Sequence, residues 1–136
     1  MKKIIFILSI TLSNLVFAQT FNGSQISKAA INTIFGHSLS DMKVKKISEN
    51  LYRVTYFDPP LNRFKGRWIK TLVKINNSSI IWKPDEKSGR WRNDPNYYGD
   101  EIITYRIKNN QLIITTTYSD NSVSTETFSP KQLSGK

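Results

Sequence analysis

The chain has 136 residues, no cysteine, and 20 lysines and arginines against 10 aspartates and glutamates, which gives a formal net charge of +10. The lack of cysteine excludes disulfides and thiolate metal sites, so stability must come from apolar burial and hydrogen bonding. The length predicts a single domain with its own core, and the charge favours acidic partners.

The first residues, MKKIIFILSITLSNLVFAQT, have the composition of a secretory signal peptide. Two lysines precede an apolar run that is shorter than the roughly 20 residues needed to span a bilayer, and Val16 and Ala18 fit the cleavage subsites. We expect cleavage after Ala18 and a periplasmic or secreted chain with no transmembrane span; an uncleaved anchor is the alternative. The mature chain keeps 18 basic against 10 acidic residues, a net charge of +8 that is also ordinary for solubility.

The mature chain begins with a helical pattern over residues 24–35. Apolar residues cover most of the circumference, and Gln25, Lys28 and Asn32 form a narrow polar stripe. Ser24 is positioned to cap the first turn, and Gly36 is a natural stop because glycine adopts the left-handed conformation without steric cost. Such a short, largely apolar helix must pack against the rest of the chain.

After residue 39 the pattern becomes extended and stays so. Alternating and β-branched residues separated by Asn, Ser, Asp and Pro turns predict antiparallel strands. The expected strands are Met42–Ile47, Leu51–Phe57, Arg67–Ile75, Ser79–Trp82, Ile102–Ile107, Leu112–Tyr118 and Val123–Phe128. The predicted fold class is therefore α+β, with one N-terminal helix packed on a curved antiparallel β-meander of about six or seven strands. Residues 19–128 form the predicted domain, and residues 129–136 a flexible tail.

Motifs for catalysis, metals and cofactors are weak. The single histidine, His37, follows the helix, where a structural role is expected, and no Gly-x-Ser-x-Gly or Gly-x-Gly occurs. A hydrolytic site assembled from Asp58, Asp94 and Asp100 stays open, since folding rather than sequence brings such carboxylates together. We expect a protein that is not an enzyme and that has no catalytic residues, metal or cofactor.

The richest signal is a basic and aromatic interval over residues 63–92 that holds all three tryptophans. We expect Trp68 and Trp82 to anchor in the core, because aliphatic strand residues border them. Trp91 is equally compatible with burial and exposure. The predicted binding residues are Arg90, Trp91, Arg92, Asp94, Tyr97 and Tyr98, and the predicted basic stripe is Arg63, Lys65, Arg67, Lys70 and Lys74.

These features predict a small exported binding protein. The first hypothesis is a protein-interaction module of inhibitor, immunity or assembly type, whose Trp/Arg/Tyr-rich loop contacts an acidic protein surface. A binder of envelope polyanions or glycans is the alternative, with the basic stripe neutralising the ligand. A third hypothesis is a small-ligand cavity between helix and sheet, lined by Tyr52, Tyr56, Tyr105 and Tyr118. No cytosolic nucleic acid is expected as a partner, because the leader indicates export.

Overall fold

The computed structural model describes residues 21–63 and 65–134. The predicted signal peptide, residues 1–18, lies outside the described residues. The elements are helix α2 (Gly23–Phe35), the short 3-10 helix η1 (Leu39–Asp41), and strands β1 (Lys43–Ser48), β2 (Leu51–Asp58), β3 (Arg67–Asn76), β4 (Ser79–Pro84), β5 (Ile102–Lys108), β6 (Gln111–Thr117) and β7 (Val123–Phe128). The predicted α+β class is confirmed.

Helix α2 is fixed at both ends by local chemistry. The Asn22 carboxamide oxygen accepts from the Gln25 backbone N–H at 2.9 Å, and the Gln25 side chain accepts from the Asn22 N–H at 2.9 Å, which makes a capping box. The sequence suggested Ser24 as the cap, but the capping residue is Asn22. Gly36 ends the helix in the left-handed region at φ 73°, as predicted.

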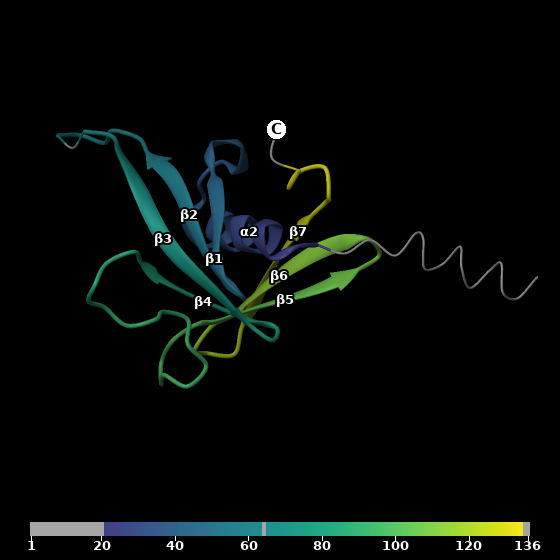
Figure 1. Cartoon of the computed structure of the whole chain (residues 1–136). Helices are drawn as coiled ribbons and strands as arrows, with labels where there is room; N and C mark the ends of the chain where they lie inside the picture. Colours follow the sequence, from purple (N-terminus) through teal and green to yellow (C-terminus); the bar gives the residue numbers. More distant parts are fainter. Residues whose placement is uncertain (1–20, 64, 135–136) are drawn as a thin grey trace, which may run out of the picture.

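The seven strands follow one another in space as they do in sequence, all antiparallel. Strands β4 and β5 pair over a very short length, because their only register pair is Ser79 with Thr104. The sheet therefore divides into a β1–β4 half and a β5–β7 half. In Figure 1 the two halves diverge from this join, and α2 lies in the angle between them.

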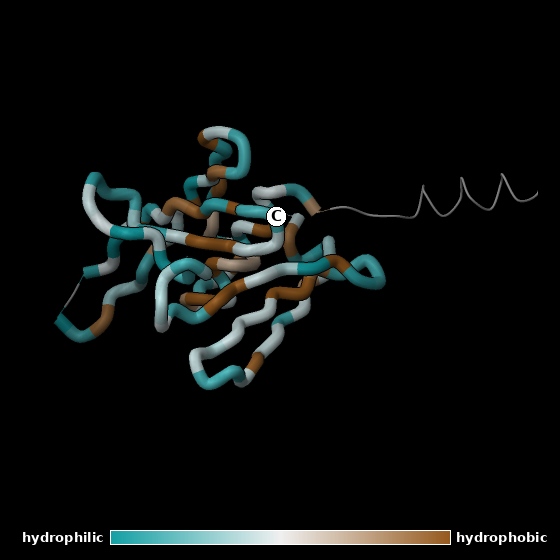
Figure 2. Tube along the Cα trace, turned by 90° about the horizontal axis from the view of Figure 1, so that it is seen from below, coloured by the Kyte–Doolittle hydropathy of each residue, from teal (hydrophilic) through white to brown (hydrophobic). Residues whose placement is uncertain are grey.

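The core lies on the concave side of the sheet, against α2. Tyr52, Val54 and Tyr56 share one face of β2, because alternate residues of a strand point the same way, and all three are buried there. In Figure 2 the apolar stretches of several strands meet in the middle of the molecule, while most of the peripheral loops are hydrophilic. Lys28, which the sequence placed on a narrow polar stripe of the helix, is also buried.

The C-terminal segment differs from the predicted flexible tail. Leu133 is only 2% exposed and belongs to the core cluster. Local bonds shape the segment, because the Leu133 N–H donates to the Pro130 carbonyl and the Ser129 N–H donates to the Gln132 side chain. A single apolar residue has no periodicity, so the sequence pattern could not reveal this contact.

Replacing Asn22 by alanine should destabilise the fold by about 1 kcal/mol, because the Gln25 backbone N–H loses its acceptor. Asn22→Asp is the matched control, since it keeps an acceptor and places a negative charge at the helix N-terminus. The midpoints of urea unfolding measure the stability of both variants against the wild type. Equal midpoints for the alanine variant and the wild type would show that the capping box contributes nothing.

Candidate interaction surface

The loop between β4 and β5 is braced by an ion pair. The Arg90 guanidinium donates two hydrogen bonds to the Asp100 carboxylate, from Nη1 to Oδ2 at 2.8 Å and from Nη2 to Oδ1 at 2.9 Å. The same carboxylate accepts the Asp94 backbone N–H at 3.1 Å. Arg90 also stacks on Tyr97, with 3.6 Å between the guanidinium carbon and the ring centroid. Arg90 therefore holds the loop together and is not a free contact residue.

The pKa of Asp100 reflects this pairing. The hydrogen bonds from Arg90 are the largest cause and lower the pKa to about 2, against an opposing effect of burial. Asp100 therefore stays charged at any physiological pH, and its ion pair with Arg90 stays intact. The hydrolytic site considered for Asp58, Asp94 and Asp100 would have to use an acid that is already fully engaged.

Trp82 joins the loop to the sheet. Its indole N–H donates to the Asn93 side chain at 2.6 Å, and the Asn93 amide donates to the Glu101 carbonyl at 2.9 Å. Its backbone pairs with Arg92 in an isolated antiparallel bridge. Trp82 also packs against the core, so the predicted anchoring is right for this tryptophan.

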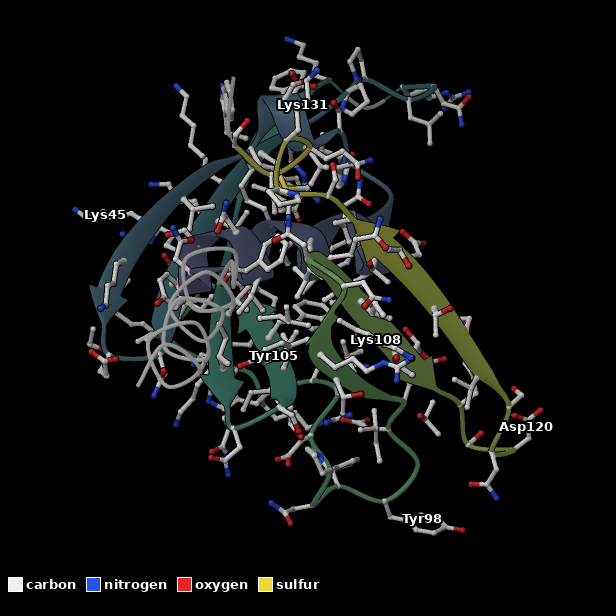
Figure 3. The ribbon with its side chains drawn as sticks, turned by 90° about the vertical axis from the view of Figure 1, so that its right-hand side faces the viewer. Lys45, Tyr98, Tyr105, Lys108, Asp120 and Lys131 are labelled. Atoms are coloured by element: carbon white, nitrogen blue, oxygen red, sulfur yellow. The ribbon has the colours of Figure 1, made fainter. Side chains whose placement is uncertain are left out.

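The remaining predicted loop residues have mixed environments. Trp91 is half-buried, with the Lys83 ammonium 5.5 Å from its ring centroid. Arg92 is exposed and has no ion pair within the described part of the chain. Tyr98 is completely exposed, and Figure 3 shows it at the loop tip, pointing away from the molecule. Of the predicted set, only Arg92 and Tyr98 offer a side chain not already engaged.

Trp68 contradicts the prediction of a core anchor, because 57% of it is exposed. Its register partner on β2 is Phe57, and their rings make an edge-to-face pair at 5.4 Å. Both side chains point away from α2, since their neighbours Tyr56 and Ile69 point toward it. The Lys43 ammonium lies 5.7 Å from the Trp68 ring centroid.

The strand register divides the predicted basic stripe. Lys70 and Lys74 lie on the convex side of β3 with Trp68, because alternate residues share a face. Arg67 lies on the opposite face of the same strand. Arg63 and Lys65 lie in the loop that precedes β3. The five residues therefore do not form one line.

The convex side of β1–β4 gathers other cations instead. The only acid that we place on it, Asp85, forms an ion pair with Arg53, with 2.6 Å between Arg53 Nε and Asp85 Oδ2. We call this surface the basic outer face, defined by Lys43, Lys45, Phe57, Trp68, Lys70, Lys74 and Lys83. Figure 3 shows Lys45 projecting outward from its edge. The sequence signal for this face was the spacing of its lysines, which are two residues apart in β1 and four apart in β3.

Two grooves open near the concave side. The first, about 480 Å³, lies where β3, the end of β4 and the C-terminus of α2 meet, and Phe35, Tyr56 and Trp82 line it. Phe35 meets Trp82 edge-to-face at 4.8 Å. Burial raises the pKa of Tyr56, whose hydroxyl bonds to Thr71 at 3.2 Å. The second groove, about 410 Å³, is more polar and is lined in part by Arg92 and Tyr118.

The four tyrosines proposed for a ligand cavity are not gathered around one space. Tyr52 is buried in the core cluster, and Tyr105 is packed against it. Tyr56 and Tyr118 line different grooves. Helix α2 itself fills the concave side between the two halves of the sheet.

Comparison with known proteins gave no match, whether to a family model, a curated protein or a solved structure. Within residues 21–63 and 65–134, His, Asp and Glu form no cluster of metal-site size. No helix in the same residues is long and apolar enough to cross a membrane.

Asp100→Asn tests the loop brace through its pH dependence. A carboxyl whose pKa is lower in the folded than in the unfolded state stabilises the fold above its unfolded pKa, here 3.8, and this contribution is lost as the pH falls toward 2. The wild-type urea midpoint should therefore fall between pH 4 and 2 more steeply than that of Asp100→Asn. Asp94→Asn, which leaves the Arg90–Asp100 pair intact, should keep the steeper profile. Identical profiles for wild type and Asp100→Asn would contradict the assignment.

Proposed function

We propose that this chain is a small exported protein that acts by binding, and that its basic outer face contacts an acidic surface on a partner protein. The leader at residues 1–18 supports export. The observation that carries the proposal is the exposure of Trp68 within a field of lysines. An exposed indole beside a second aromatic ring is typical of the centre of a protein interface.

The energetics favour Trp68 as the centre of the contact. A tryptophan buries up to about 250 Å², so covering its exposed half at about 25 cal/mol per Å² contributes ~3 kcal/mol. The surrounding lysines speed encounter and select acidic partners more than they add affinity. The face is pre-formed by paired strands, so binding requires little ordering of the backbone.

This proposal moves the predicted contact away from the loop. Arg90 and Asp100 are used to fold the loop, whereas Trp68 makes few contacts of its own. The loop tip supports a secondary contact, because the whole of the Tyr98 side chain is available there. The type of module, whether inhibitor, immunity or assembly factor, stays a hypothesis.

A photocrosslinking amino acid at Thr55 tests the proposal. Thr55 lies on the convex side between Lys43 and Lys70, so a partner on the basic outer face would be within reach. We expect one discrete protein adduct in the secreted or periplasmic fraction, reduced roughly 100-fold in affinity by Trp68→Ala, the equivalent of about 3 kcal/mol. The same probe at Thr125, in the other half of the sheet, is the control. An adduct equally strong at both positions, or unaffected by Trp68→Ala, would contradict the proposal.

The polyanion alternative keeps one observation in its favour, which is the number of lysines on the face. It predicts retention on heparin that falls steeply with salt, because each neutralised anion releases counterions. Lys70→Gln combined with Lys74→Gln should reduce that slope. If retention on heparin depends steeply on salt and no protein adduct forms at Thr55, the partner is a polyanion and not a protein.

A further inference from the structure

Part of β3 is paired on one side only. Strand β2 pairs with β3 from Arg67 to Lys74, whereas β4 pairs with it only from Thr71 to Asn76. The last bond on the β4 side runs from the Asp85 N–H to the Lys70 carbonyl at 3.0 Å. In Figure 1, β3 extends well past the end of β4. The segment 67–69 is therefore an open edge within the sheet.

The direction of the free backbone groups follows from that last bond. The Lys70 carbonyl points toward the β4 side, and in an antiparallel strand the N–H and C=O groups of alternate residues point the same way. Trp68 therefore directs its N–H and C=O to the open edge. Strand β4 does not continue along it, because the chain turns at Pro84, whose carbonyl accepts the Glu86 N–H at 2.8 Å.

The larger groove lies directly along this edge. Residues 67–71 of β3 form one wall, residues 84–86 form another, and Phe35, which is 38% exposed, lies at the end of the helix. A strand added beside Trp68 would alternate its side chains between this aromatic groove and the basic outer face. Both sides of such a strand would therefore have a protein surface to contact.

The charges around the edge select an acidic ligand. Arg67 and Lys70 flank it, and Lys65 lines the adjoining hollow at the start of β3. On the acidic side, Asp85 is already bonded to Arg53, which leaves Glu86 as the acid of this groove without an ion pair in the described residues. Asp58 lines the adjoining hollow beside Lys65 and Arg67, and it has no ion pair in the described residues either. Cations therefore outnumber free carboxylates where the ligand would lie.

We propose that the open edge of β3 binds an extended acidic peptide segment of the partner by strand addition, with an apolar side chain of the peptide in the groove beside Phe35 and Trp82. This inference rests on the proposed function, because it names the part of the partner that is recognised. The backbone of Trp68 supplies the hydrogen bonds, and the groove and the flanking cations supply the selectivity.

A pair of substitutions at Trp68 separates the backbone from the side chain. Trp68→Ala removes the indole and keeps the N–H, whereas Trp68→Pro removes both. Proline is tolerated here because the lost N–H faces the open edge rather than β2. The difference in affinity between the two variants therefore depends on the backbone N–H position of residue 68 and not on the indole.

Peptides for the measurement come from a random decapeptide library displayed on phage and selected against the wild-type protein. We expect enriched peptides in which acidic residues alternate with an apolar one. The best synthetic peptide should bind Trp68→Pro about 10-fold more weakly than Trp68→Ala. A peptide N-methylated at the residue facing Trp68 should lose about 10-fold on the wild type, which decides the matter even if Trp68→Pro does not fold.

Two results would overturn strand addition. The first is a library that yields no acidic alternating peptide. The second is equal binding of the N-methylated and unmethylated peptides to the wild-type protein, whether or not Trp68→Pro folds. In either case, a crosslinked adduct at Thr55 that depends on Trp68 would still support the proposed function. If that adduct is absent too, both the proposed function and strand addition are wrong.

Discussion

The packing of one helix into the concave side of one sheet is the constraint on which the rest of this structure depends. Ala29, Ala30 and Ile31 are completely buried at this contact, and the two alanines let the helix axis approach the strands closely. A single helix covers only one face of a sheet. No helix of the described residues covers the convex side of β1–β4, and lysines lie on it beside Trp68.

The same constraint gives the three tryptophans three different environments. Trp82 faces the helix, so its ring packs at the core and its N–H bonds to the loop. Trp91 comes from the loop and rests half-buried beside Lys83. Trp68 points to the uncovered side and stays exposed. Composition put them in one interval, but the face each occupies separates their roles.

The loop shows how folding can engage a residue that the sequence suggested for binding. Arg90 and Asp100 are ten residues apart, and their bidentate pair closes the loop between the two halves of the sheet. Charged pairs of this geometry are strong and directional. Arg90 of the predicted contact set braces the loop, whereas Tyr97 and Tyr98 of the same set stay exposed.

Much of the fold followed from the sequence because its signals are local. Gly36 marked the helix end, alternation in β2 marked the buried face, and turn residues marked the hairpins. Local patterns say which residues share a face, but not which face another element will cover. The exposure of Trp68, the pairing of Arg90 with Asp100 and the open edge left where β4 ends at Pro84 were decided only by tertiary structure, because each depends on segments brought together from distant parts of the chain.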